Sequence, residues 1–201
     1  VVSEGEPAGK KPAILDTEGG EVDGAVAVVG MSCRFPGAAT DPDAFWRNIE
    51  AGVDAVTRIR DSRPQIIADQ LRDRGDLTNF PEFAGFTDGV EEFDAAFFGI
   101  APLEAQAMDP QQRRLMELTW HLLEDSGYRP AGMRGRRIGV YVGAHTSDYA
   151  ELLFGRPELA DTYGAYMDSG THPAFLANRV SRWYDFRGPS RVFNTACSSS
   201  L

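Results

Sequence analysis

Cysteine, positive charge and long apolar runs are all scarce in this sequence. Its 201 residues include only two cysteines, too few for a disulfide framework, which indicates a reducing cytoplasm. Asp and Glu outnumber Lys and Arg by 30 to 20, a net charge of −10, which argues against a nucleic-acid-binding protein because nucleic acids require basic surfaces. No apolar run approaches the roughly 20 residues that span a bilayer, and the acidic N-terminus does not resemble a signal peptide.

The remaining composition is that of a globular protein, with 42% apolar and 25% charged residues and enough length for a hydrophobic core. Residues 1–24 differ from the rest, being rich in Gly, Pro and acidic residues, with few large aliphatic residues, among them the adjacent pair Ile14 and Leu15. Such a segment buries too little apolar surface to become ordered. We therefore predict a flexible linker or tail over residues 1–24 and an ordered domain over residues 25–201.

Short apolar runs that alternate with amphipathic stretches predict a layered α/β fold with at least partly parallel strands. Continuous apolar runs indicate strands buried on both faces. We expect such strands at residues 25–30 and 137–143, and a further strand near residues 190–194. Helices are expected around residues 148–154 and 174–184.

Two further helices have clear end signals. Asp41 is a predicted N-cap with Pro42 in the first turn, and Gly52 is placed to end that helix. The longest helix is expected between Asp109, as its N-cap, and Gly127, as its left-handed C-terminal residue. Four leucines of this helix share one face and predict its buried side: Leu115, Leu118, Leu122 and Leu123.

The last eight residues, "NTACSSSL", place one thiol among small polar side chains directly after a predicted strand. A strand, a tight turn and a helix start would present the sulfur of Cys197 and direct backbone N–H groups toward it, which favours the nucleophilic thiolate. The same N–H groups would stabilise an oxyanion during attack on a carbonyl. The alternative is a cysteine that acts only as a small buried apolar residue at a helix start.

This C-terminal stretch resembles the active-site signature of the ketosynthases of modular type I polyketide synthases, in which the cysteine lies in D-T-A-C-S-S-S-L. Further stretches resemble the family in order and at normal spacing from residue 25 to residue 201. They are "VAVVGMSCRFPGA" (26–38), "DPDAFWRNIEAGVDAV" (41–56), the block 89–118 and "FLANRVSRWYDFRGPS" (175–190). The resemblance identifies Cys197 as the catalytic nucleophile.

The resemblance implies a thiolase-like fold, in which two similar α/β halves pack as five layers (αβαβα) and the domain works as a homodimer. The chain then corresponds to the N-terminal half of a β-ketoacyl synthase domain. Two family histidines, in H-G-T-G-T and G-H-x-E-x-A-A-G contexts, belong to the second half and do not occur here. We therefore expect the 201-residue segment to be inactive alone. No family role transfers to His121, His145 or His172, although His172 is a candidate for lining an acyl pocket.

Two positions bear on the site. Asn194 replaces the usual Asp before Thr195 and removes a negative charge, which is not expected to abolish the nucleophile. Cys33 fits a common family variant and is interpreted as structural.

The reaction that the resemblance implies is decarboxylative Claisen condensation of an acyl chain, held on Cys197 as a thioester, with a malonyl-type extender. Both substrates are carried on the phosphopantetheine arm of an acyl carrier protein. No directly bound cofactor or metal is expected.

The implied partners are the acyl carrier protein, a second copy of the domain and the remainder of a multidomain synthase, with neither nucleic acid nor membrane. Carrier proteins are acidic, so the arginines of the loop 132–137 (Arg134, Arg136 and Arg137) and of the long helix (Arg113 and Arg114) are candidates for docking, although solvated side chains explain them equally. "YDFRGPS" resembles synthases that use a separate acyltransferase.

Three alternatives remain open. The first is a non-elongating ketosynthase, which transfers or gates an acyl chain without condensation. The second is a purely structural or docking half-domain. The third is a cysteine hydrolase, which would need its own histidine partner and would leave the resemblance over residues 25–201 unexplained.

Overall fold

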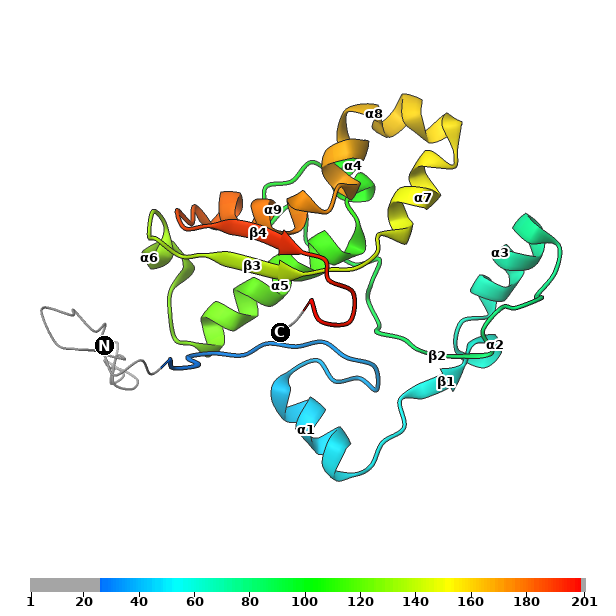
Figure 1. The fold of residues 1–201 in the computed structure, drawn as a ribbon, viewed down its shortest axis with the longest axis horizontal. Coiled ribbons are helices and arrows are strands. Elements are labelled where there is room, and N and C mark those ends of the chain that lie inside the picture. The colour runs from blue at the N-terminus through cyan, green and yellow to red at the C-terminus, as the bar shows by residue number, and fades with distance from the viewer. Residues whose placement is uncertain (1–25, 200–201) are drawn as a thin grey trace, which may run out of the picture.

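A pair of parallel strands forms the centre of the fold (Figure 1). In the computed structural model, which describes residues 26–199, β3 (Val140–Gly143) pairs with β4 (Ser190–Phe193), and the register sets Val140 opposite Ser190. Parallel strands need a long crossover connection. Here it consists of α7 (Asp148–Phe154), α8 (Pro157–Thr171) and α9 (Ala174–Tyr184). The prediction of an α/β fold with parallel strands is confirmed.

The core lies where α5 (Pro110–Asp125) and α9 pack together beside this sheet. The hydroxyl group of Tyr184, on α9, donates a hydrogen bond to the carbonyl oxygen of Met116, on α5, at 3.1 Å. Both side chains are almost fully buried. The core cluster joins these helices to the short helix at residues 130–133 and to neighbouring loops: Phe98, Met108, Met116, Leu123, Met133, Val180, Tyr184 and Phe186.

The two predicted helix starts are confirmed. Asp41 caps α1 (Pro42–Glu50) by accepting a hydrogen bond from the backbone N–H of Ala44 at 2.7 Å. Asp109 caps α5 by accepting from the backbone N–H of Gln111 at 2.8 Å. Gly52 and Gly127 follow the ends of these helices with φ values of +63° and +73°, a conformation that strains other residues.

The buried side of α5 differs from the predicted leucine face. Its most buried side chains are Gln112, Met116 and Leu123, whereas Leu122 is 36% exposed. The helix turns a polar residue inward because the side chain of Gln112 binds the backbone of α8 and the guanidinium group of Arg179 on α9. A buried glutamine with hydrogen-bond partners cannot be recognised from apolar spacing.

The prediction of a strand buried on both faces at residues 25–30 is wrong for its described part. Residues 26–30 belong to no strand, and Val26 and Val28 are 94% and 79% exposed. The segment runs alongside α5, where the backbone N–H of Met31 donates to Asp125 and the hydroxyl of Ser32 donates to the carbonyl oxygen of Leu118. β3 is likewise exposed on one face, because Tyr141 is 60% exposed.

Several elements were not predicted. The antiparallel pair of β1 (Val56–Arg58) and β2 (Phe83–Gly85), with α2 (Ile59–Ser62) and α3 (Pro64–Arg74), projects away from the β3–β4 sheet (Figure 1). Two short helices, α4 (Pro102–Ala107) and α6 (Pro130–Met133), begin with prolines. The linker predicted over residues 1–24 lies outside the described residues. No helix within residues 26–199 has the length and apolar character needed to cross a membrane.

Gly170 has the least space for a side chain among the glycines of the described residues. Its carbonyl oxygen accepts a hydrogen bond from the backbone N–H of Asp109 at 2.8 Å, and a Cβ atom added to it would lie 2.1 Å from the carbonyl oxygen of Ala107. Gly170→Ala should therefore lower the free energy of unfolding of the intact domain by about 1–3 kcal/mol. Denaturant unfolding measures this effect. Gly164→Ala, in the same helix but with open space around it, is the matched control and should not destabilise.

Candidate functional site

Cys197 lies on a tight turn at the C-terminal end of β4. Ala196 has a φ of +55°, in the left-handed region that non-glycine residues rarely adopt. Backbone N–H groups of Ser198 and Ser199 donate to the carbonyl oxygens of Thr195 and Ala196. The Cys197 side chain is exposed. The prediction of a turn that presents the sulfur is confirmed, whereas the N–H groups of Ser198 and Ser199, which were expected to point toward the sulfur, donate within the turn instead. Residues 196–199 form this turn, and no helix begins before Ser199, where the described residues end.

The small hydroxyl residues around Cys197 hold the turn together. The Ser199 hydroxyl donates to the carbonyl oxygen of Ala196 at 2.7 Å and accepts from the backbone N–H of Thr195 at 2.9 Å. The Ser198 hydroxyl lies 2.9 Å from the carbonyl oxygen of Thr195. These contacts satisfy backbone groups that a turn would otherwise leave unpaired, so the turn keeps its shape without covering the thiol.

Gly143 lets this turn pack against the end of β3. A Cβ atom added to Gly143 would lie 2.5 Å from the carbonyl oxygen of Ser199, well inside any normal contact. Gly143→Ala should therefore displace the turn and slow alkylation of Cys197 by iodoacetamide severalfold in the intact domain. Gly132→Ala, where nothing lies within 4 Å of the added atom, should leave that rate unchanged. Equal rates for both variants would show that this packing does not shape the site.

The loop after β3 is hydrogen-bonded to the same turn. The Nδ1 atom of His145 lies 3.2 Å from Oδ1 of Asn194, and Nδ2 of Asn194 donates to the carbonyl oxygen of His145 at 3.0 Å. Oδ1 of Asn194 also accepts from the backbone N–H of Ala196 at 3.3 Å. Nothing in the spacing or composition of the sequence indicated that His145 would contact Asn194, three residues before Cys197. The available signal was topological, since neighbouring parallel strands end at the same edge of a sheet.

The other two histidines lie outside this arrangement. His121 is exposed on α5, with Nδ1 3.4 Å from a carboxylate oxygen of Glu124. His172 ends α8, and its Nδ1 accepts from the backbone N–H of Ala174 at 3.2 Å. Within residues 26–199, neither forms a hydrogen bond with the Cys197 turn, so the structure adds no support for His172 in an acyl pocket.

Cys33 differs from Cys197 in its surroundings. It is half-buried. Burial raises the pKa of its thiol, and the negative charge of Asp41 raises it further. Both effects disfavour the thiolate. These surroundings fit the structural role expected for Cys33.

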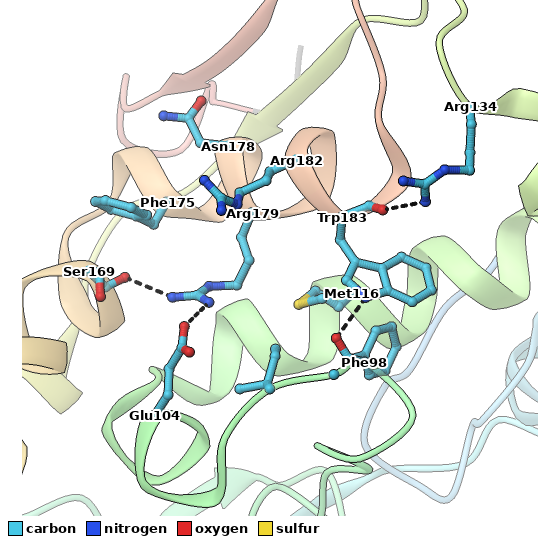
Figure 2. Close-up of a pocket in the computed structure, with 12 residues that line it drawn as sticks. Phe98, Glu104, Met116, Arg134, Ser169, Phe175, Asn178, Arg179, Arg182 and Trp183 are labelled. Atoms are coloured by element: carbon cyan, nitrogen blue, oxygen red, sulfur yellow. Dashed lines mark hydrogen bonds and ion pairs between the residues drawn. The ribbon is translucent and has the colours of Figure 1, made fainter.

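A cavity of about 930 Å³ lies between α4, α5, α8, α9 and the loop around Phe98, and Cys197 does not line it. Figure 2 shows that Arg179 reaches from α9 into it toward Glu104. Arg179 donates to Glu104 at 2.5 Å, to Oε1 of Gln112 at 2.9 Å and to the carbonyl oxygen of Ser169 at 3.3 Å. This network fixes α9 against α4, α5 and α8, and α9 leads into β4 and the Cys197 turn. Its role is therefore to hold the scaffold of the site.

The arginines considered for docking fall into two groups. Arg134 and Arg136 are exposed and bind nearby backbone carbonyl oxygens, of Trp183 and Gly132 respectively. Arg114 pairs with Glu117 at 2.8 Å and donates to the carbonyl oxygen of Gly89, which is a structural role. The arginines of the loop 132–137 are therefore the more accessible group.

Comparison with known proteins places the fold in the class of ketosynthase domains, which have a thiolase-like layered α/β fold. A ketosynthase domain of oxazolomycin biosynthesis from Streptomyces albus JA3453 superposes with a TM-score of 0.71 at 35% identity, over 86% of this chain and 30% of that chain. The ketosynthase from module 6 of the bacillaene synthase of Bacillus subtilis 168 superposes with a TM-score of 0.68 at 31% identity, over 87% and 27% of the two chains.

The family follows from the sequence comparisons. The family model "Beta-ketoacyl synthase, N-terminal domain" matches residues 23–201, and the chain therefore belongs to that family. It is 42% identical over 180 residues to probable polyketide synthase 1 of Dictyostelium discoideum, covering 88% of this chain. It is 38% identical over 199 residues to the pikromycin polyketide synthase component PikAII of Streptomyces venezuelae, covering 98%. The chain spans about 5% of the length of either relative.

Proposed function

We propose that this chain is the N-terminal half of a ketosynthase that elongates a polyketide chain, with Cys197 as its nucleophile. The observation that carries the proposal is an exposed thiol on a braced turn at the end of a parallel strand, in a chain that the family model matches from residue 23 to residue 201. Residues 1–24 would be a linker or tail and residues 25–201 the half-domain. Two unpaired thiols suit a reducing cytoplasm.

In the first half-reaction, the thiolate of Cys197 attacks the carbonyl carbon of an acyl thioester on the phosphopantetheine arm of an acyl carrier protein. A carbon–sulfur bond forms to Cys197, and the arm leaves as a thiol after taking up a proton. The transient oxyanion needs hydrogen-bond donors fixed in advance. The turn holds the backbone around Cys197 rigid, but the N–H groups of Ser198 and Ser199 donate within the turn, so the donors would have to come from other groups near the sulfur.

In the second half-reaction, a malonyl-type thioester loses carbon dioxide, and the resulting carbanion attacks the Cys197 thioester. The new carbon–carbon bond gives a β-ketoacyl chain two carbons longer on the carrier protein, and the Cys197 thiolate leaves. The family histidines of the second half would assist decarboxylation, so the 201-residue chain alone would not condense.

The proposed assembly includes a second copy of the domain, the carrier protein and further domains of a synthase. β4 pairs only with β3 among the described residues, which leaves one strand edge for pairing with another chain. The exposed arginines of the loop 132–137 suit an acidic carrier protein. The stretch Tyr184–Ser190 supports a synthase whose acyltransferase is a separate protein.

The test uses the intact ketosynthase domain that contains this chain, with an acyl thioester and a malonyl thioester, each on a carrier protein. The expected results are an acyl group on Cys197 by mass spectrometry and a β-ketoacyl carrier protein as product. Acylation without condensed product would instead identify a non-elongating ketosynthase. Failure of acylation at Cys197 would refute the proposal and favour a structural half-domain.

A further inference from the structure

The side chain of Asn194 connects the Cys197 turn to the loop after β3 by three contacts. Its Oδ1 atom lies 3.3 Å from the backbone N of Ala196 and 3.2 Å from Nδ1 of His145. Its Nδ2 atom lies 3.0 Å from the carbonyl oxygen of His145. Ala196 is the residue with the left-handed backbone conformation, directly before Cys197. The hydrogen bond at Ala196 therefore stabilises the backbone conformation that sets the direction of the Cys197 side chain.

Two backbone groups fix which way the Asn194 amide points. The N–H of Ala196 can only donate, so the atom facing it must be the amide oxygen. The carbonyl oxygen of His145 can only accept, so the atom facing it must be the amide nitrogen. With the amide oxygen thus placed beside Nδ1 of His145, that ring nitrogen must carry a proton. The geometry assigns His145 the Nδ1–H form.

Aspartate, the usual residue before Thr-Ala-Cys in the family that the sequence resembles, does not satisfy this arrangement. An ionised carboxylate has no donor, and its second oxygen would face the carbonyl oxygen of His145 at the 3.0 Å now spanned by the hydrogen bond from Nδ2. The hydrogen bond from Nδ2 would be replaced by two acceptors facing each other, and because Asn194 and His145 are exposed, water limits the cost to about that of the lost hydrogen bond and the repulsion.

We infer that Asn194 and His145 form a matched pair that positions the Cys197 turn, and that this chain requires an asparagine at the position where the signature that it resembles has aspartate. The inference rests on the proposed role of Cys197 and deepens it, because Asn194 and His145 act through the backbone of Ala196 and do not touch the reacting atoms. Restoring the family signature with Asn194→Asp should therefore impair the site and not improve it.

The experiment measures two rates at Cys197 in the intact domain: alkylation by iodoacetamide and self-acylation by an acyl carrier thioester. Asn194→Asp should lower both by about tenfold, the size expected for replacing one hydrogen bond by an unfavourable contact. The maximal acylation rate should fall while the donor concentration for half-maximal rate stays the same, because donor binding is not altered. His145→Phe, which keeps the backbone carbonyl, should slow the reactions less than Asn194→Asp does.

Asn178→Asp is the matched control. Oδ1 of Asn178 accepts a hydrogen bond from the Ser190 hydroxyl at 2.8 Å, at the other end of β4. Aspartate at position 178 keeps an acceptor for this bond and adds the same negative charge as Asn194→Asp. This variant should react like the unmodified domain. If it slows as much as Asn194→Asp, added charge explains the effect and the matched pair is refuted. Asn194→Asp rates equal to or above those of the unmodified domain would also overturn the inference.

Nitrogen-15 NMR of the His145 ring in the unmodified domain gives an independent readout, and it decides the matter if Asn194→Asp does not fold. A ring in the Nδ1–H form supports the pair, and a ring in the Nε2–H form contradicts it. Alkylation needs no carrier protein, so the rate comparison remains valid even if the unmodified Cys197 accepts no acyl group. Failure of the proposed function is thus distinguishable from failure of the pair.

Discussion

Cys197→Ala should abolish self-acylation of the intact ketosynthase domain. The substitution removes the sulfur and little else, because the Cys197 side chain is exposed and the turn is held by hydrogen bonds of Thr195, Ser198 and Ser199. The fold should therefore survive, with a melting temperature close to that of the unmodified domain. Mass spectrometry after incubation with an acyl carrier thioester measures the acyl group directly.

Cys197→Ser is the informative companion variant. It retains the shape of the side chain and should still react almost not at all, because a hydroxyl without an adjacent base is a far weaker nucleophile than a thiolate. Cys33→Ala is the control and should acylate normally. A Cys197→Ala domain that still carries an acyl group would show that another residue is the nucleophile.

The 201-residue chain expressed by itself should self-associate. Its described part exposes large apolar side chains over extended areas, including Trp46 and Ile49 on α1, at 59% and 52%, and Val28, at 79%. Tyr141 on β3 and Phe193 on β4 stack on each other on an exposed face of the sheet, with ring centroids 6.3 Å apart. Exposed apolar surface on this scale marks an interface that another segment or chain covers.

Sedimentation and light scattering test this expectation, with the intact ketosynthase domain as the reference. Replacing Val28 and Trp46 with serine should reduce the association of the short chain, whereas Arg60→Ser, an exposed polar change, should not. A monomeric short chain that melts cooperatively would contradict the account, since it would show that these surfaces need no cover.

Local signals in the sequence predicted much of the fold correctly. The N-caps Asp41 and Asp109, the glycines that follow α1 and α5, and the bounds of α7 and α9 all depend on contacts within a few residues. The predictions that failed concern features that depend on tertiary contacts. The apolar run at residues 26–30 has strand composition, yet within the described residues it lies along α5 without a strand partner.

The candidate site shows the same division. Small residues around Cys197 predict a turn, because the relevant hydrogen bonds join neighbours in the chain. The contact between His145 and Asn194 joins residues 49 positions apart, and the link between Arg179 and Glu104 joins residues 75 positions apart. Neither is visible in spacing or composition, since each depends on the packing of α9 and the parallel register of β3 and β4.

The reactivity of the two thiols near neutral pH tests the central claim most directly. Cys33 is half-buried, and burial together with the charge of Asp41 raises the pKa of its thiol. Its thiolate is therefore scarce at neutral pH and increases only at higher pH than for an ordinary cysteine. Cys197 is exposed on its turn.

Mass spectrometry of the intact domain after brief iodoacetamide treatment, with and without acyl carrier thioester, compares the two thiols. The account predicts rapid labelling of Cys197, slow labelling of Cys33, and protection of Cys197 by the acyl donor. Label and acyl group on Cys33, with Cys197 free, would contradict it.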